Sequence, residues 1–428
     1  MIQIVPYDPE WPRQFEIERE RIAAALGGAA LRIDHVGSTS VPGLAAKPVI
    51  DIQISVARLH PLDRYRAQLE SLGYRHRPHP DDACCPYFHK PVEKPHTHHV
   101  HVVEANGREE RHTLRFRDHL RAHPEAAMEY EALKRRLASQ ISVEDSYADA
   151  KGSFVEGIID AAAVEAYYNV YAEEDRLSAG PFALEYERTK DILTRVLPPP
   201  PARIVDVGGA AGTYSLWLAR LGYEVHLVDA TARLVDEAGR RSAAAAHPLA
   251  SASVGDARRL PQTDSSADAV LVMGPLYHLT TATDRLAALR EAFRVLRTGG
   301  TVAAAAISRY AAALDGLATK ASLDPVFAAI RDRDLADGQH RNETGNPRYF
   351  TTAYFHRPED LREELDAVGF HDAAVLGIEG PGWILGDFDT RWANPLERAD
   401  MMAVARAVEA EPSVIGASAH LLAIARRR

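Results

Sequence analysis

The chain has 428 residues, a mass of 47.0 kDa and a formal net charge of -10. This length predicts two to three domains at about 150 residues each. The acidic balance argues against a nucleic-acid partner, because phosphate contacts need a basic face. No run approaches the roughly 18 apolar residues of a membrane span. The adjacent cysteines Cys84 and Cys85 suit a reducing compartment, and the first residues do not resemble a signal peptide. We therefore expect a cytoplasmic protein without a membrane partner.

The first 165 residues predict a domain of mixed strands and helices. This part holds 12 of the 19 histidines. Its β-branched runs predict strands at Arg32–Val36, Val49–Val56, Tyr87–His89 and Thr97–Val103. A helix is predicted at Leu62–Leu72, and helices are predicted from Gly107 to about Ala163. This order of elements is typical of an α+β domain.

The second part predicts strands that alternate with helices. A helical stretch, Ala166–Val196, leads into four prolines that deliver the chain to the first strand of this part. The predicted strands are Ile204–Val207, Glu224–Val228, Ser253–Val254, Ala269–Met273 and Thr301–Ile307. The predicted helices are Tyr214–Leu221, Ala232–Ala246 and Asp284–Val295. Such alternation predicts a parallel sheet with helices on both faces.

A glycine-rich turn joins the first of these strands to its helix. Residues 204–212 read IVDVGGAAG, in which Asp206 is followed by Gly208, Gly209 and Gly212. Glycine lets the backbone approach a ligand closely at a helix N-terminus. Asp229 ends the next strand, where a carboxylate can accept hydrogen bonds from ribose hydroxyls. Asp256 and Ala257 follow the third strand, where an acid suits the exocyclic amine of adenine.

These motifs, in this order, resemble a class I S-adenosylmethionine-dependent methyltransferase of the small-molecule type over residues 166–428. The resemblance implies a Rossmann-like, mostly parallel, seven-stranded domain that binds S-adenosylmethionine. The predicted cofactor-binding residues are Asp206, Gly208, Gly209, Gly212, Asp229, Asp256 and Ala257. Ala210 departs from the family pattern, which has a glycine there. A nicotinamide dehydrogenase is the competing hypothesis for the turn, but its usual pattern is Gly-x-Gly-x-x-Gly.

The residues after the fourth strand are candidates for the methyl-transfer step. The segment Gly274–Leu279 contains Tyr277 and His278, which we predict to be catalytic or to contact the acceptor. A histidine is the usual general base near neutral pH. The alternative is that both residues only shape the cofactor pocket. An insertion at Ser308–Thr352 is either a substrate lid or a helical decoration.

The N-terminal domain contains a glycine–serine turn opposite an acid. Gly37 and Ser38 end one predicted strand, and Asp51 lies on the next. A Gly–Ser turn can bind phosphate oxygens, and a neighbouring acid can hold a divalent metal between them. Lys47 and Lys151 are candidate anion contacts. These features predict a nucleoside triphosphate site.

The same region resembles the GrpB family, which has a nucleotidyltransferase-like fold. The resemblance rests on residues 5–11, 35–54, 97–103, 116–118 and 147–154. An active nucleotidyltransferase usually has a second acid where this chain has Gln53. His99 and His101 share a strand face where a third acid often lies. Asp51, His99 and His101 therefore form a candidate site for Mg²⁺, Mn²⁺ or Zn²⁺, with polar packing as the alternative.

Three hypotheses follow for the whole chain. In the first, a methyltransferase acting on a small molecule carries a domain that binds or transfers a nucleotide. In the second, the N-terminal domain is a non-catalytic ligand-binding or docking module. In the third, the chain is a nucleotide-sensing regulator with a degenerate methyltransferase fold. The sequence favours methyl transfer, because Asp206, Asp229 and Asp256 are all present.

Overall fold

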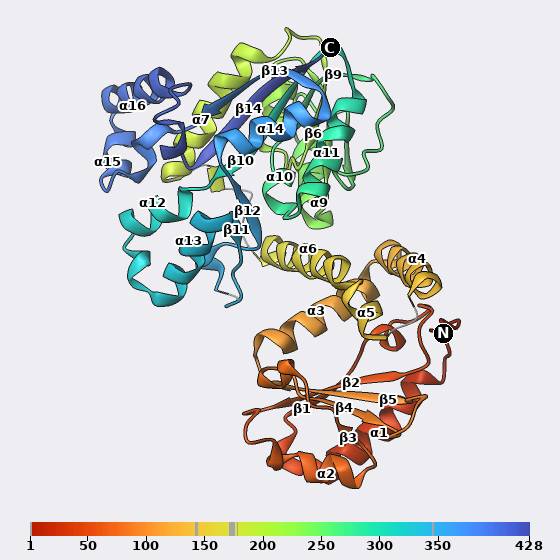
Figure 1. Cartoon of the computed structure of the whole chain (residues 1–428). Helices are drawn as coiled ribbons and strands as arrows, with labels where there is room; N and C mark the ends of the chain where they lie inside the picture. Colours follow the sequence, from red (N-terminus) through yellow and green to blue (C-terminus); the bar gives the residue numbers. More distant parts are fainter. Residues whose placement is uncertain (1, 142–143, 171–175, 178, 345) are drawn as a thin grey trace. The chain divides into compact units, whose positions relative to one another are not determined.

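Contacts within the computed structural model divide the chain into two units, Met1–Ala163 and Val164–Arg428. The structure describes residues 2–141, 144–170, 176–177, 179–344 and 346–428. Figure 1 shows the elements of each unit. None of the helices in the described part of the chain is long and apolar enough to cross a membrane.

The first unit is built on a mixed sheet with the strand order β1-β2-β5-β4-β3. The central strands β2 and β5 run parallel, and the other neighbours are antiparallel. The strands are β1 (Arg32–Val36), β2 (Ile50–Val56), β3 (Arg75–His76), β4 (Tyr87–Lys90) and β5 (His98–Glu104). The helices are α1 (Trp11–Leu26), α2 (Arg66–Ser71), α3 (Arg108–Ala122), α4 (Pro124–Gln140), α5 (Glu144–Asp149) and α6 (Gly152–Val170), which crosses the unit boundary.

Strand alternation gives this sheet one apolar and one polar face. Ile50, Ile52 and Ile54 pack with Trp11 and Ile22 of α1 in the core of the unit. The intervening residues of β2 point to the other face together with His99 and His101 of β5. The predicted candidate residues Asp51, His99 and His101 belong to this second face. Sequence inspection missed α1, although its buried residues recur every three to four positions.

The second unit contains a mostly parallel sheet with the order β11-β12-β10-β9-β6-β7-β8, and β14 lies between β10 and β13. Its strands are β6 (Arg203–Val207), β7 (Glu224–Asp229), β8 (Ser251–Val254), β9 (Ala267–Val272), β10 (Leu296–Ser308), β11 (Gln339–His340), β12 (Ala353–His356), β13 (Phe370–Gly377) and β14 (His420–Arg427). The predicted Rossmann-like sheet is confirmed. The short strand β11 of the insertion and β12, which follows the insertion, extend the sheet beyond seven strands.

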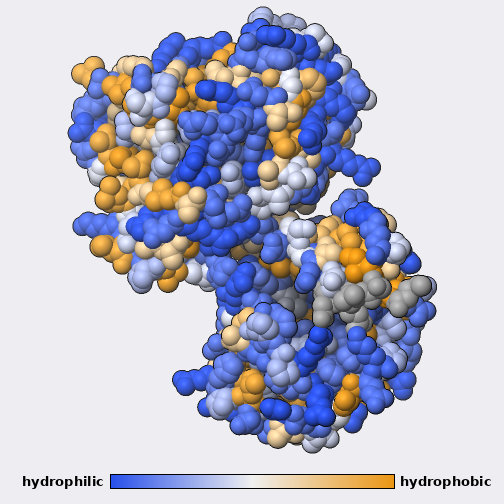
Figure 2. All heavy atoms as spheres, in the orientation of Figure 1, coloured by the Kyte–Doolittle hydropathy of each residue, from blue (hydrophilic) through white to orange (hydrophobic). Residues whose placement is uncertain are grey.

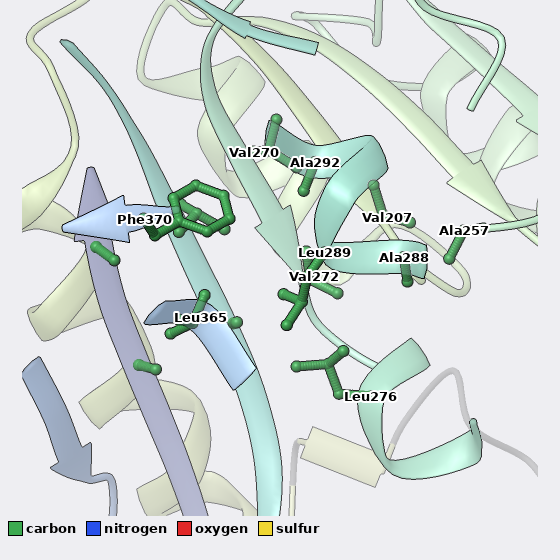
Figure 3. Packing of buried hydrophobic residues seen from close by; sticks show 14 of the residues in the cluster. Val207, Ala257, Val270, Val272, Leu276, Ala288, Leu289, Ala292, Leu365 and Phe370 are labelled. Carbon is green, nitrogen blue, oxygen red and sulfur yellow. The ribbon is translucent and has the colours of Figure 1, made fainter. Parts of the chain in front are cut away.

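Helices surround this sheet. They are α7 (Pro181–Val196), α8 (Thr213–Arg220), α9 (Ala232–Ala243), α10 (Pro275–His278), α11 (Ala282–Val295), α12 (Ala311–Ala318), α13 (Pro325–Asp337), α14 (Pro358–Val368), α15 (Phe388–Ala393) and α16 (Pro395–Val408). Figure 3 shows Leu289 of α11 and Leu365 of α14 packed with Val270 and Val272 of β9. On the other face, α7 and α8 pack against β6, β7 and β9.

Two predicted segments differ from the structure. The single helical stretch Ala166–Val196 is divided, because α6 ends at Val170 and α7 begins at Pro181. Residues 171–175 and 178 of that stretch lie outside the described part. The helix predicted at Leu62–Leu72 is a 3-10 turn at Leu62–Arg64 followed by α2.

Candidate functional site

The glycine-rich turn lies between the C-terminus of β6 and the N-terminus of α8. Gly208, Ala210 and Gly212 all have positive φ, at +78°, +47° and +82°. At Gly208 a Cβ atom would lie 2.5 Å from Cδ of Pro275, so this position requires glycine. Ala210 adopts the left-handed conformation that glycine adopts freely. The turn therefore keeps its shape although the family's middle glycine is absent.

Asp206 lies beneath this turn and is completely buried. Its Oδ2 accepts a 2.6 Å hydrogen bond from Ser215 of α8, while Oδ1 has no partner among the described residues. Burial raises the pKa of Asp206 to about 6. The residue is thus a desolvated carboxyl group with a spare acceptor atom beside the turn.

Asp229, at the end of β7, connects the neighbouring strand to the turn. Its Oδ2 accepts a hydrogen bond of 2.9 Å from the amide of Ala210, and its Oδ1 accepts one of 2.8 Å from the amide of Thr231. Burial raises the pKa of Asp229. Each carboxylate oxygen has two lone pairs, so both can still accept from a ligand hydroxyl.

Asp256 follows β8 and is engaged by a neighbour. Its carboxylate accepts from the backbone amide and the guanidinium of Arg258, with an Nη2–Oδ2 distance of 2.6 Å. These contacts occupy the atoms that we predicted to bind an adenine amine. Ala257, the adjoining predicted residue, is buried in the core cluster with Val207. Sequence inspection could not detect the ion pair with Arg258.

Tyr277 and His278 form the end of α10, directly after β9. Nδ1 of His278 lies 3.3 Å from the carbonyl oxygen of Thr352, which can only accept, so Nδ1 carries the proton. Nε2 is then an acceptor, and the phenol of Tyr168 donates to it at 2.9 Å. Burial lowers the pKa of His278 to about 4, so the ring is neutral at physiological pH.

The end of α6 reaches two strand ends. The phenol of Tyr168 contacts His278, which follows β9. Its backbone carbonyl accepts a 2.7 Å hydrogen bond from Arg233, which lies on α9, the helix after β7. Tyr168 thus joins the segments that follow β7 and β9. Tyr171, which follows in the same segment, lies outside the described residues.

The insertion after β10 packs beside His278. Phe327 of α13 and Phe355 of β12 form a buried cluster that Tyr277 and Phe350 contact. The ring of Phe350 lies 5.8 Å from that of His278. The insertion also exposes apolar residues, including Leu317 of α12 at 74% and Leu323, between α12 and α13, at 81%. Hydrophobic atoms are visible on the surface of this unit in Figure 2. The insertion is therefore packed on its inner side, while apolar side chains remain on its surface.

In the first unit, the turn at Gly37 touches Asp51. Gly37 has a φ of +67°, and a Cβ atom there would lie 2.3 Å from Oδ2 of Asp51. Ser38, the next residue, hydrogen-bonds through its side chain to Tyr130 of α4. The predicted turn and acid are thus adjacent, and Tyr130 is an additional neighbour that sequence inspection missed.

Asp51 pairs with His99 and is not surrounded by further candidate metal ligands among the described residues. Its Oδ1 lies 3.2 Å from Nδ1 of His99, whose Nε2 lies 3.2 Å from Nδ1 of His96. Burial acts to raise the pKa of Asp51, but the hydrogen bond and charge of His99 outweigh it and lower the pKa. Nδ1 of His101 is directed to Cys85 instead, at 3.7 Å from Sγ.

The three predicted metal ligands do not converge. Among the described residues, Asp51, His99 and His101 do not form a group whose donor atoms all lie within 4.8 Å of one another. Gln53, in the position of the missing second acid, is completely buried, and neither polar atom of its amide has a partner in the described part of the chain. The side chains observed here therefore do not form a ready-made metal site.

Lysines gather near Asp51. The charge of Asp51 acts on Lys151, which stacks over the Tyr147 ring at 4.5 Å. Burial lowers the pKa of Lys151, and the charge of Lys47 acts in the same direction. Lys134, which the sequence analysis missed, is buried and donates to the carbonyl of Ala45. Burial lowers the pKa of Lys134 to about 7.

Comparisons with known proteins agree with this division. Residues 1–161 match the family model "GrpB protein". The chain is 40% identical over 163 residues to UPF0157 protein BH1888 of Halalkalibacterium halodurans, covering 38% of this chain and 82% of that protein. The chain belongs to the GrpB family. It is also 41% identical over 140 residues to UPF0157 protein YqkA of Bacillus subtilis, which covers 32% of this chain but only 40% of YqkA.

The GrpB domain is joined to a second one. Residues 204–300 match the family model "Methyltransferase domain". A crystal structure of a SAM-dependent methyltransferase from Methanosarcina mazei is 18% identical, covering 55% of this chain and 96% of that chain, with a TM-score of 0.37. The chain is thus a fusion of a GrpB domain with a methyltransferase domain.

Proposed function

We propose that the second unit transfers a methyl group from S-adenosylmethionine to a small-molecule acceptor. The observation that carries the proposal is the turn from Gly208 to Gly212, held by Asp229 at the carboxyl edge of the sheet. Parallel α/β sheets bind nucleotide ligands at this edge. Bound S-adenosylmethionine supplies an activated methyl group, so the protein mainly needs to hold donor and acceptor in line.

The residues around the turn fit this cofactor. Asp229 offers its remaining lone pairs to the ribose hydroxyls, and the buried Asp206 offers its spare Oδ1 near the turn. The backbone from Gly208 to Gly212 lets the ligand approach without a side chain in the way. Asp256 has to exchange at least one contact with Arg258 before it accepts from the adenine amine.

Tyr277 and His278 are proposed to contact the acceptor. At neutral pH the unprotonated Nε2 of His278 accepts hydrogen bonds, and Tyr168 occupies it. The hydroxyl group of a methyl acceptor can donate to Nε2 only if it replaces the phenol of Tyr168. Otherwise it can hydrogen-bond to the phenol itself. The aromatic rings of Tyr168, Tyr277 and Phe350 surround His278, which favours a small acceptor over a macromolecule.

Calorimetric titration of S-adenosylmethionine into the full chain tests the cofactor assignment. Binding should be abolished in Asp229→Ala, which removes both the ribose acceptor and the support of the turn. Asp229→Asn keeps one oxygen acceptor and should bind more weakly than the wild type. Asp236→Ala, an exposed acid on α9, is the control and should bind normally. Absence of binding to the folded wild type would reject the proposal.

For the GrpB domain we propose binding of a nucleoside triphosphate through its phosphates. Support comes from the contact between the Gly37–Ser38 turn and Asp51, and from the proximity of Lys151. A divalent metal would have Asp51 and His99 as nearby donors. Titration of ATP with Mg²⁺ or Mn²⁺ tests this proposal, with Lys151→Met and Asp51→Asn expected to weaken binding. If ATP does not bind, the domain is a docking or ligand-binding module of another kind.

A further inference from the structure

A cavity lies within the methyltransferase unit, beside the end of the glycine-rich turn, because Thr213 and Arg241 line it. Its volume is about 790 Å³, and it is lined by parts of α7, α8, α9, α15 and α16. Ligand cavities of small molecules typically measure about 300–1,000 Å³. None of Asp206, Gly208, Asp229, Tyr277 and His278 lines it. The cavity is therefore a candidate for a ligand other than the methyl donor.

The charged side chains of the cavity favour an anion. Arg241 of α9 and Arg398 of α16 both line it. Among the described residues, neither guanidinium has a carboxylate partner: Arg241 donates to the carbonyl of Ala211 at 3.2 Å, and Arg398 lies over the Trp392 ring at 5.8 Å. The lining acid Glu187 is already paired with Lys190 at 3.0 Å. This part of an otherwise acidic chain thus presents unneutralised positive charge.

The helices add to this charge. Thr213 is the first residue of α8 and Pro395 the first of α16, and both line the cavity. Helix N-termini carry a partial positive charge that favours nearby anions. The effect reinforces that of the two arginines, which remain the main feature of the site.

The remaining walls favour a flat apolar group. Tyr186, Trp392 and Met402 line the same cavity. Aromatic and thioether side chains give large apolar contact areas, and guanidinium groups pair with carboxylates or sulfonates through several hydrogen bonds. We infer that this cavity binds a small organic anion that combines a carboxylate or sulfonate with a flat apolar part. This site does not depend on the proposed methyl transfer.

Calorimetric titration of the full chain with 2-naphthoate and with its uncharged amide, 2-naphthamide, tests the inference. The wild type should bind the anion at least tenfold more tightly than the amide. The guanidinium of Arg398 donates to no backbone carbonyl among the described residues, so Arg398→Gln disturbs no such contact and should weaken naphthoate binding severalfold. The double variant Arg241→Gln/Arg398→Gln should weaken it at least tenfold and change naphthamide binding less than twofold. Ala399→Phe, which places a ring in the cavity, should weaken both ligands.

Arg220→Gln provides the matched control, because Arg220 is an exposed arginine at the end of α8 that does not line the cavity. It should bind both ligands like the wild type. Thermal unfolding of each variant shows whether it is folded before titration. The inference is overturned if naphthoate does not bind the wild type, if both ligands bind equally, or if Arg220→Gln has the effect of the double variant.

Discussion

The phenol of Tyr168 donates a 2.9 Å hydrogen bond to Nε2 of His278, although the two residues are 110 positions apart. The carbonyl of Thr352 fixes the other ring nitrogen as the protonated one. The pair thus places a neutral imidazole at the end of α10 with a defined tautomer. Whatever binds beside His278 meets a hydrogen-bond acceptor that already has a donor.

This pairing predicts an unusual titration. Because burial disfavours the imidazolium, His278 should stay neutral until the pH falls to about 4. Tyr168→Phe removes a hydrogen bond to the neutral ring, so the pKa should rise, although burial still holds it below 6.5. Histidine NMR titration measures both values, with His278→Gln used to assign the resonance. A wild-type pKa near 6.5 would contradict the buried, tyrosine-bound geometry.

Asp206 should make the unliganded fold less stable as the pH rises. Its pKa is raised from 3.8 to about 6, so the folded state keeps a proton that the unfolded state has lost. The free energy of unfolding should therefore fall between pH 4 and 6, by about 3 kcal/mol in all. Asp206→Asn keeps an acceptor for Ser215 and should remove this loss.

Urea unfolding at pH 4 and pH 7.5 measures the effect. The stability of Asp206→Asn relative to the wild type should increase at the higher pH. The exposed residue in Asp236→Asn offers a comparison, and this variant should show no such change. If the difference between Asp206→Asn and the wild type is independent of pH, the carboxyl group is not titrating as described.

The two glycines Gly208 and Gly239 should respond oppositely to alanine. In Gly208→Ala the new methyl group collides with Pro275, and the φ of +78° is strained for alanine. The free energy of unfolding should therefore fall by more than about 1 kcal/mol, and cofactor binding should be lost. Gly239 lies inside α9 with nothing within 4 Å of a Cβ atom. Gly239→Ala should therefore stabilise the protein by about 0.5–1 kcal/mol. Thermal unfolding and titration with S-adenosylmethionine compare the two variants.

The adjacent cysteines should differ in reactivity. Burial raises the pKa of Cys85 to about 12; it also raises the pKa of Cys84, but that side chain is exposed. Since the thiolate is the reactive form, a disulfide reagent such as DTNB at pH 8 should modify Cys84 quickly and Cys85 only after unfolding. Cys84→Ser should abolish the fast reaction, and fast labelling of that variant would show that Cys85 is accessible.

Local patterns were sufficient to predict the glycine turn and nine of the strands in the described part of the chain, but β3 and β11 to β14 were missed. The run from Ile204 to Val207 followed by glycines has few alternative structures, and β1 matches its predicted bounds. The helix α1 was missed because its first turn contains a proline and its apolar positions are separated by charged residues. Its spacing of buried residues is a usable signal.

The side-chain contacts of the site depend on distant segments. Nothing near Asp256 in the sequence shows whether its carboxylate contacts Arg258 or stays open, and nothing near His278 points to Tyr168. The metal prediction at Asp51, His99 and His101 assumed that residues on one strand face converge. His101 instead faces Cys85, a contact between β5 and the segment before β4.

The position of β14 sets the order in which the two units can form. This strand, His420–Arg427, lies between β10 and β13 and pairs with both. The two strands can therefore be joined in one sheet only after residues 420–427 have been synthesised. All elements of the β1–β5 sheet have left the ribosome long before that point. The GrpB domain can therefore fold during translation. Until β14 is synthesised, the edges of β10 and β13 that pair with it stay unpaired, and such edges are the kind of surface that chaperones bind.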